Sequence, residues 1–325
     1  MDNLTHSLVG AVMGQAGLKQ KTGLAMPALI IGANLPDVDA ACFFWLEGSE
    51  HLGFRRGITH GPPAMVLLPL VLAALLWGWD RWQTKRGKRP EDRLPVHFGW
   101  LYVLSFIGCL SHPALDWLNV YGVRFLEPFS SQWFYGDTLF IIDVWLWALL
   151  AVTTWLSLRT EKRGGNWKRP AWIGSVIGLA YIALNGLFTQ AAVTRDSDVI
   201  SPGREVIASP VPLRFWEREM IIGGNGRYQI VNPAIERLDP EDVTPEIGAQ
   251  YVANVGECEV PDISYQVPAW RTEIGAFLFW TRTPFATRRE GGGIILHDAR
   301  FYDPRARDRF SVVLLDVECV ELTER

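Results

Sequence analysis

Histidine and aspartate side chains that could hold a metal ion occur inside or beside strongly apolar segments of this chain. A charged group at bilayer depth is costly, so ionisable residues in such segments are candidates for function. Histidine nitrogens and carboxylate oxygens together suit a divalent metal. The candidate ligands are His6, Asp37, Asp39, His60, His112 and Asp116. They predict a metal site if the fold brings them together.

The run Asn34-Leu35-Pro36-Asp37-Val38-Asp39 carries two of these carboxylates. Pro36 interrupts helical hydrogen bonding, and irregular backbone at bilayer depth is tolerated only where protein or a wet cavity covers it. In extended backbone, Asp37 and Asp39 would project to the same side. Two carboxylates that lie close together repel unless a cation or a proton lies between them. The run therefore favours a cation site. The alternative is a helix end, with both aspartates in the first turn of the next helix.

His112 and Asp116 are four residues apart, which places both side chains on one face of a helix. That spacing suits two ligands of one metal, or one ligand with its supporting carboxylate. Pro113 could break the helix between them. The alternative is a hydrogen-bonded pair between helices.

His60 follows Thr59 and directly precedes an apolar segment. It is a candidate ligand, and the alternative is a solvated loop histidine. Arg55 and Arg56 could bind an anionic phosphate by bidentate hydrogen bonds, or could be ordinary charges at a membrane boundary. His6 could equally be a residue at a helix start.

Residues 1–191 are apolar and rich in tryptophan, and we expect about five or six membrane-embedded helices in them. The short first segment has Gly10 and Gly14 spaced for close helix packing. The predicted segments are Leu4–Leu18, Leu24–Leu46, Pro62–Trp79, Val96–Leu118, Leu139–Leu158 and Ala171–Ala191.

Basic residues in short loops set the orientation of these segments. The loops after Trp79 and after Leu158 are both strongly basic, so both should be cytoplasmic. The candidate ligands then fall at the outer side of the membrane, although Arg55 and Arg56 on an outer loop weigh against this orientation. Asp137 and Asp143 lie at the outer start of the next segment, where either could accept a proton.

Residues 192–325 read as a small, soluble β-rich or α+β domain on the extracytoplasmic side. Gly-rich turns separate its strand-like runs, and we expect it to act as a lid, a substrate platform or a partner-binding surface. Cys258 and Cys319 could pair in an oxidising compartment, but the sequence leaves their distance open. The predicted strands are Arg204–Ala208, Leu213–Met220, Tyr228–Val231, Ile263–Val267, Ile274–Trp280, Gly293–Leu296 and Phe310–Val317.

The bulk composition excludes some functions. A net charge near −4 argues against a dedicated nucleic-acid binder. The N-terminus has no basic region before its apolar run, so no cleavable signal peptide is expected.

Four motifs in order resemble the YdjM/YfhP-type family of inner-membrane proteins, whose members are inferred to be metal-dependent hydrolases. The resemblance covers roughly the first 190 residues and implies the six ligands named above. The family is distantly similar to zinc-dependent phospholipase C and P1-type nucleases, which implies phosphoester hydrolysis by analogy of fold. The motifs are Thr5-His6-Ser7-Leu8-Val9-Gly10, Asn34-Leu35-Pro36-Asp37-Val38-Asp39, Arg56-Gly57-Ile58-Thr59-His60-Gly61 and Ser111-His112-Pro113-Ala114-Leu115-Asp116.

The sequence therefore predicts a multi-pass inner-membrane hydrolase with one or more divalent ions, zinc being the expected metal. The metal would activate a water molecule, Asp137 or Asp143 would take its proton, and Arg55 or Arg56 would hold the anionic group of the substrate. A site at headgroup depth suggests a lipid or lipid-linked phosphoester.

Two other functions are compatible with the sequence. The protein could be a non-enzymatic membrane metal-binding protein or a transporter, because broken helices with ion sites are typical of transporters. No inverted repeat is evident in the sequence, which counts against transport. Alternatively, residues 192–325 could be the active part, with the membrane half as an anchor.

Overall fold

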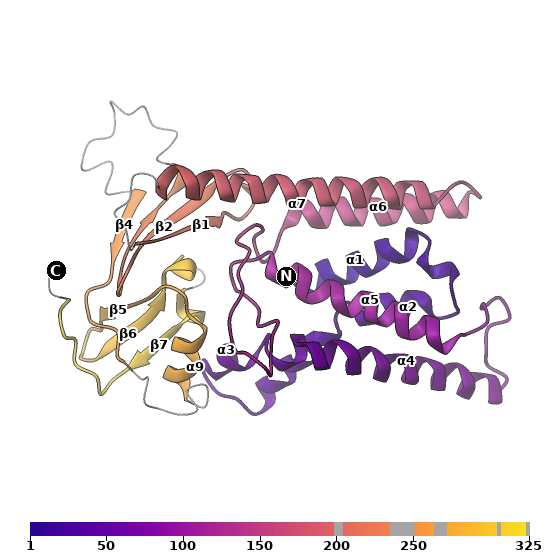
Figure 1. The fold of residues 1–325 in the computed structure, drawn as a ribbon, viewed down its shortest axis with the longest axis horizontal. Coiled ribbons are helices and arrows are strands. Elements are labelled where there is room, and N and C mark those ends of the chain that lie inside the picture. The colour runs from indigo at the N-terminus through magenta and orange to yellow at the C-terminus, as the bar shows by residue number, and fades with distance from the viewer. Residues whose placement is uncertain (198–203, 235–250, 263–271, 304–306, 323–325) are drawn as a thin grey trace. The chain divides into compact units, whose positions relative to one another are not determined.

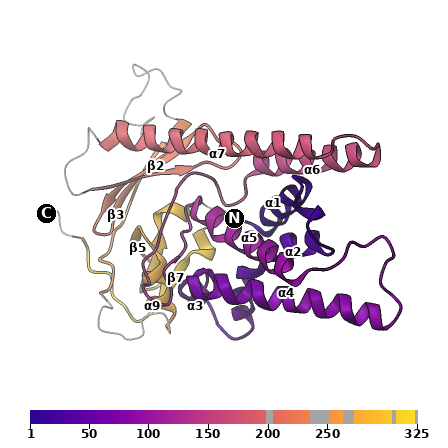
Figure 2. The ribbon, with the colours of Figure 1, turned by 45° about the vertical axis from the view of Figure 1, so that its right-hand side comes forward.

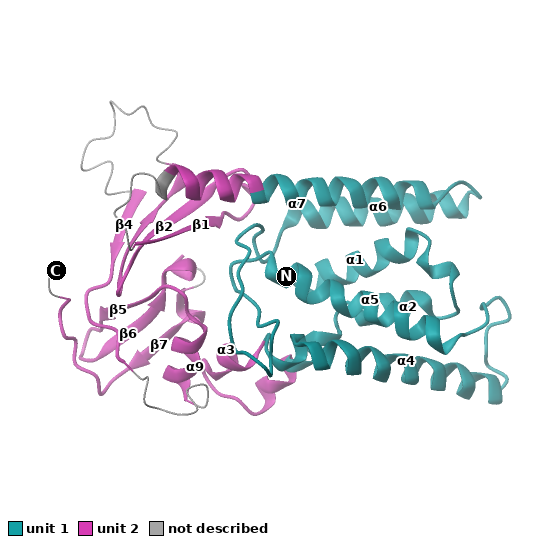
Figure 3. Ribbon diagram, viewed as in Figure 1, with its two compact units in different colours: residues 1–39, 56–186 teal, residues 40–55, 187–325 magenta. Residues whose placement is uncertain are grey.

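A computed structural model describes residues 1–197, 204–234, 251–262, 272–303 and 307–322. The chain divides into two compact units (Figure 3). The first unit contains residues 1–39 and 56–186, and the second contains residues 40–55 and 187–325. The expected domain boundary after residue 191 stays a prediction.

Helices form the first unit (Figure 1). Helix α1 packs against α2 and α6, while α5 packs against α2 and α4, and α1, α2 and α5 lie side by side in both ribbon views (Figure 2). Two 3₁₀ segments, η2 (Leu35–Phe44) after α2 and η3 (Ile58–His60) before α4, carry three of the candidate ligands themselves. The helices are α1 (Asn3–Gln15), α2 (Ala25–Gly32), α4 (Pro62–Lys85), α5 (Phe98–Trp117), α6 (Val144–Lys162) and α7 (Lys168–Ser197), the last continuing into the second unit.

Within the described residues, three helices are long and apolar enough to cross a membrane: Pro62–Lys85, Phe98–Trp117 and Lys168–Arg195. A bent pair, Ala25–Gly32 and Leu35–Phe44, meets at 51° and would raise the number to four if it forms one broken span. The expected number of five or six membrane-embedded helices is therefore not confirmed. Helix α1 has only 13 residues, fewer than the roughly 20 that a span needs.

Capping and chain breaks explain where the helices begin and end. Asp2 caps α1 by accepting hydrogen bonds from the amides of Leu4 at 2.9 Å and Thr5 at 3.1 Å. After α2, the Asn34 side-chain amide donates to the Ile30 carbonyl at 2.8 Å and to the Ser7 hydroxyl at 3.0 Å. The chain then continues as the 3₁₀ segment η2. Asp37 and Asp39 therefore lie in helical backbone, in place of the extended backbone that the sequence suggested.

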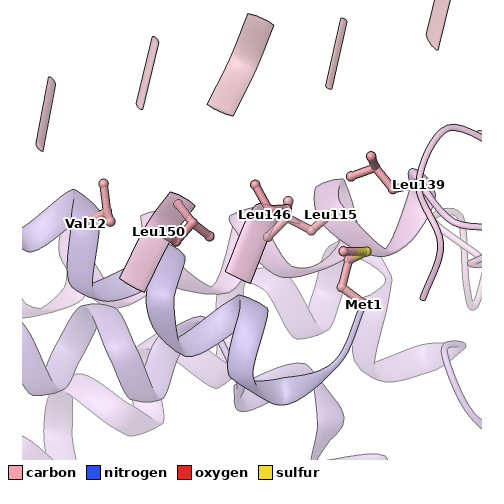
Figure 4. Close-up of a cluster of buried hydrophobic side chains, with 6 residues drawn as sticks. All are labelled: Met1, Val12, Leu115, Leu139, Leu146 and Leu150. Atoms are coloured by element: carbon pink, nitrogen blue, oxygen red, sulfur yellow. The ribbon is translucent and has the colours of Figure 1, made fainter. Parts of the chain in front are cut away.

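Glycines allow the ligand-bearing helices to approach closely. A Cβ atom at Gly10 of α1 would lie 2.8 Å from the Leu29 carbonyl oxygen, and one at Gly108 of α5 would lie 2.6 Å from the same atom. Both helices thus contact the α2 backbone, which no side chain would permit. A hydrophobic cluster joins α1, α5 and α6 (Figure 4), formed by Met1, Val12, Leu115, Leu139, Leu146 and Leu150.

Two antiparallel sheets make the C-terminal part of the chain β-rich, as expected. The first sheet has the order β1 (Glu205–Pro210), β2 (Arg218–Gly224), β3 (Arg227–Val231) and β4 (Val252–Val255). The second has the order β5 (Pro284–Arg288), β6 (Ile294–Asp298) and β7 (Ser311–Leu314).

One predicted strand in this region is wrong, because Ile274–Trp280 lies in the helix α9 (Glu273–Trp280). The Thr272 hydroxyl caps that helix by accepting from the Gly275 amide at 3.1 Å. Leu213–Met220 overlaps β2 only at its end. The predicted strand Ile263–Val267 lies outside the described residues.

Two features tie distant parts of the second unit together. Residues 40–55 include the short helix α3 (Glu50–Phe54), which packs against α9. At the start of α3, the Ser49 amide donates to a Glu273 carboxylate oxygen at 3.0 Å. Cys258 and Cys319 form a disulfide bond, with a Cα–Cα distance of 5.1 Å.

Candidate metal centre

Four separate elements of the first unit bring the predicted ligands together. His6 lies on α1, Asp37 lies on η2, His60 ends η3, and His112 and Asp116 lie on α5. The side chains of His6, His112 and Asp116 are fully buried, and His60 is 1% exposed. Pro113 lies inside α5 without ending it, so His112 and Asp116 keep their spacing on one helix face.

The Asp116 carboxylate lies at the centre of the cluster. Its Oδ2 atom is 3.5 Å from His60 Nε2 and also 3.5 Å from His112 Nε2. Its Oδ1 atom is 3.4 Å from His6 Nε2. Asp37 Oδ1 lies 3.7 Å from the same His112 Nε2 atom. Two groups therefore have all their donor atoms within 4.8 Å of one another: His6 with His112 and Asp116, and Asp37 with His60 and His112.

These separations fit a metal site better than a hydrogen-bond network. Donors around a tetrahedral zinc ion stand about 3.4 Å apart when each lies about 2.1 Å from the ion. The observed distances of 3.4–3.7 Å match this spacing and exceed the usual length of a hydrogen bond. Among the described residues, the buried Nε2 atoms of His6, His60 and His112 have no hydrogen-bond partner. A buried polar atom without a partner is costly, and a bound cation would remove that cost for each nitrogen that coordinates it.

The other ring nitrogen of His112 fixes its tautomer. His112 Nδ1 lies 2.7 Å from the Ala33 carbonyl oxygen, to which it can only donate. In the neutral imidazole, Nε2 then carries the lone pair that faces the cluster, which is the arrangement of a metal-bound histidine supported by a carbonyl.

His60 is oriented through Thr59 and Asp39. The Thr59 hydroxyl donates to Asp39 Oδ2 at 3.0 Å, so its oxygen accepts from His60 Nδ1, also at 3.0 Å. Nε2 of His60 therefore presents its lone pair to Asp116. Burial lowers the pKa of His60 below its ordinary value, and the nearby Asp116 carboxylate opposes this only in part. The neutral imidazole that a metal requires is thus favoured.

Asp39 lies outside both groups of possible ligands in the described part of the chain. Its Oδ2 atom accepts from the Arg56 amide at 2.8 Å as well as from Thr59. The structure thus places it behind His60. Its predicted role as a direct ligand stays a prediction.

Arg56 is buried beside the cluster. Its Nε atom is 3.0 Å from Asp116 Oδ2, and its Nη1 atom donates to Asn119 Oδ1 at 3.1 Å and to the Gly122 carbonyl at 3.3 Å. The guanidinium also lies 4.4 Å from the centre of the Tyr121 ring. These contacts hold Arg56 against a candidate ligand, and its predicted role in substrate binding stays a prediction.

Arg55 belongs to the second unit, where its guanidinium lies 5.6 Å from the centre of the Phe43 ring. Sequence reasoning paired it with Arg56 because the two are adjacent. The structure assigns these neighbours to different units.

The two predicted proton acceptors lie outside the described ligand groups. Asp143 caps α6 by accepting from the Leu146 amide at 2.8 Å, and its other oxygen accepts from the Tyr181 hydroxyl at 2.9 Å. Asp137 adopts left-handed backbone, with a φ of 47°. Their catalytic role stays a prediction.

Sequence reasoning missed several groups around Asp116. The amino group of Met1 contacts its Oδ1 atom, and Asn119 supports Arg56 from the next turn of the chain. Asn119 lies three residues after Asp116, and this spacing is the feature of the sequence that could have placed Asn119 near the cluster. The contribution of the Ala33 carbonyl had no signal in the sequence, because it is a backbone atom.

The helical half carries the similarity to known proteins. Residues 1–192 match the model of the YdjM inner membrane protein family. The chain belongs to this family. The match to the YdjM family contains all six predicted ligands, two of the apolar helices in full and most of the third, so the expected inner-membrane relationship is confirmed.

A similar curated protein is the uncharacterized protein YfhP of Bacillus subtilis (strain 168), which is 25% identical over 141 residues. The aligned part covers 41% of this chain and 39% of that relative. The chain thus spans less than half the length of the curated relative that it matches. No solved structure matches the chain.

Proposed function

We propose that this member of the YdjM family is a membrane-embedded, metal-dependent hydrolase that cleaves a phosphoester in a lipid or lipid-linked substrate. The convergence of the buried His6, His60, His112 and Asp116 with the partly buried Asp37 carries the proposal. Zinc is the proposed metal because the donors are nitrogen and carboxylate oxygen at tetrahedral spacing.

A divalent ion in such a site would lower the pKa of a water molecule and polarise a phosphoryl oxygen. The protein itself supplies a cation beside the central carboxylate. Asp116 faces the Arg56 guanidinium at 3.0 Å, which compensates its buried negative charge. The imidazoles of His60 and His112 are held by Thr59 and by the Ala33 carbonyl, so their lone pairs stay directed into the cluster.

The position of the ligands along the helices supports a lipid substrate. His60 lies two residues before the start of α4, separated from it by Gly61. Asp116 is the second-last residue of α5. At about 1.5 Å per residue, His112 lies only about 8 Å from the same end of α5. If these helices span the membrane, a site at their ends would lie near headgroup depth, where the phosphoester of a lipid is found.

The test uses the full-length protein purified in detergent, with its metal content measured beside hydrolysis of phospholipids in mixed micelles. His112→Ala is expected to abolish both bound metal and hydrolysis. His97→Ala is the matched control, because His97 is an exposed residue at the opposite end of α5. Bound metal without hydrolysis of any phosphoester in the wild type would contradict the proposal.

A membrane metal transporter is the second candidate, and the bent pair α2 and η2 favours it. Asp37 follows the 51° break between these helices, and broken helices with ion sites are typical of transporters. Metal flux into liposomes that hold the wild-type protein, with no hydrolysis of their lipids, would support transport. Hydrolysis without flux would exclude it.

A further inference from the structure

The three histidines of the cluster are related to one another in two different ways. The rings of His6 and His112 are stacked, with centroids 3.8 Å apart and planes inclined by 17°. The rings of His60 and His112 meet edge to face, with centroids 5.1 Å apart and planes inclined by 63°. The two arrangements have different consequences for metal binding.

A metal ion lies close to the plane of each imidazole that binds it, about 2 Å beyond the nitrogen. The planes of two stacked rings run nearly parallel and do not meet near their nitrogen atoms. An ion in the plane of His112 would therefore lie well out of the plane of His6. The stacked pair cannot bind one ion without rotating a ring, and both side chains are fully buried in close packing.

The other pair has the geometry of a shared ion. Two imidazoles on one tetrahedral ion place their ring centroids about 5 Å apart, because each centroid lies roughly 3.2 Å from the ion. The observed 5.1 Å between His60 and His112 agrees with this spacing. Asp116 Oδ2 lies 3.5 Å from both Nε2 atoms, and Asp37 Oδ1 lies 3.7 Å from that of His112.

We propose that one divalent ion is held by Asp37, His60, His112 and Asp116, and that His6 lies outside its coordination shell. This inference rests on the metal centre of the proposed function, but not on hydrolysis. It departs from the ligand set that the family resemblance implies, which includes His6 and Asp39.

His6 then acts as a positioning residue. Its Nε2 atom faces Asp116 Oδ1 at 3.4 Å, while the ligand atom Oδ2 faces His60 and His112. Its ring also covers one face of His112. His6 thus holds two of the four ligands from behind, by one polar contact and one stacking contact.

The experiment titrates Zn²⁺ into the full-length protein in detergent by calorimetry and counts the bound imidazoles by X-ray absorption. His6→Phe keeps a ring on His112 and removes both nitrogen atoms. It is expected to bind one ion, with an affinity for Zn²⁺ lower than that of the wild type by no more than roughly 10- to 100-fold, the loss typical when a supporting contact is removed. His60→Phe, the matched control, removes a proposed ligand, and its affinity for Zn²⁺ is expected to fall by more than about 100-fold, beyond the range for a supporting contact.

The wild-type protein is expected to hold one ion on two imidazoles, a result that does not depend on whether a variant folds. Three imidazoles on one ion, or a second ion that disappears in His6→Phe, would overturn the inference. So would loss of all binding by a His6→Phe protein that still melts cooperatively.

The outcomes separate this inference from the proposed function. One ion on two imidazoles without phosphoester hydrolysis would leave the inference standing and remove the hydrolase. Hydrolysis of a phosphoester by a protein with three imidazoles on one ion would support the proposed function and overturn this inference.

Discussion

The carboxylate of Asp39 accepts a hydrogen bond from the backbone amide of Arg56 at 2.8 Å. This bond joins the two ends of residues 40–55, a segment that belongs to the second unit. Asp37 lies just before the bond and His60 lies just after it along the chain. The contact therefore brings together two candidate ligands that are separated by a long excursion in sequence.

Thr59→Val should weaken metal binding without removing a ligand. The variant has nearly the same shape but cannot accept from His60 Nδ1 or donate to Asp39 Oδ2. We expect a loss of roughly 10- to 100-fold in zinc affinity, measured by calorimetry. Thr59→Ser retains the hydroxyl and is expected to bind as the wild type does. Equal affinities of the Val and Ser variants would show that Thr59 does not orient His60.

Gly108→Ala should destabilise the helical unit. Its Cβ atom would lie 2.6 Å from the Leu29 carbonyl oxygen and 3.0 Å from the Ala33 nitrogen, and these backbone atoms cannot move independently. Overpacking of this kind costs about 1–3 kcal/mol, so the melting temperature in detergent should fall. Gly99→Ala on the same helix has no atom within 4 Å and should leave it unchanged. A similar melting temperature for both variants would contradict the close packing of α2 and α5.

The bond between Cys258 and Cys319 predicts the compartment of the second unit. Disulfides persist in oxidising environments and are rare in the cytosol, so this unit is expected on the extracytoplasmic side. In intact cells, a membrane-impermeant maleimide should label these cysteines only after reduction. Replacing both by serine should cost about 2–4 kcal/mol of stability, measured by denaturation. Labelling that requires permeabilised cells would place the unit in the cytoplasm.

His297 should make the stability of the protein depend on pH. Its ring stacks on Phe285 and meets the edge of Tyr302, and burial lowers the pKa of His297 from 6.5 to about 4. The unfolded chain therefore binds a proton before the folded chain does. The stability present above pH 6.5 is lost as the pH falls toward 4.

His297→Gln cannot titrate and should remove this component. Thermal melts between pH 4 and 7.5 are expected to show a shallower fall for the variant than for the wild type. Parallel curves would mean that His297 is protonated equally easily in both states. Comparison with the variant cancels the effect of every other titrating group.

Much of the architecture could be predicted from local patterns. Long apolar runs predicted α4, α5 and α7, because apolar length alone decides whether a helix can span a bilayer. Strand-like runs separated by Gly-rich turns predicted a β-rich C-terminal part. The expected number of five or six membrane-embedded helices is not confirmed, and α1 is shorter than a span needs. The apolar Ile274–Trp280 run forms a helix, because such a run suits a buried helix as well as a strand.

The candidate site was only partly predictable. Residue type and apolar context identified His6, His60, His112 and Asp116, which the structure brings together. The sequence could not distinguish a ligand from the group that supports it, since both are histidine or aspartate. Asp39 and Asp37 are two residues apart, yet one faces Thr59 and Arg56 while the other faces His112.

The sequence by itself determined which ionisable residues lie within the apolar half of the chain. Burying such a residue is costly, and its position among apolar residues can be read from composition and spacing. Only the tertiary structure decided that the rings of His60 and His112 meet edge to face while the ring of His6 stacks on His112. The physical reason is that ring orientation depends on how four elements pack through Gly10 and Gly108, which allow the approach, and on hydrogen bonds to Ala33 and Thr59. These contacts join residues far apart in the chain, and no local pattern records them.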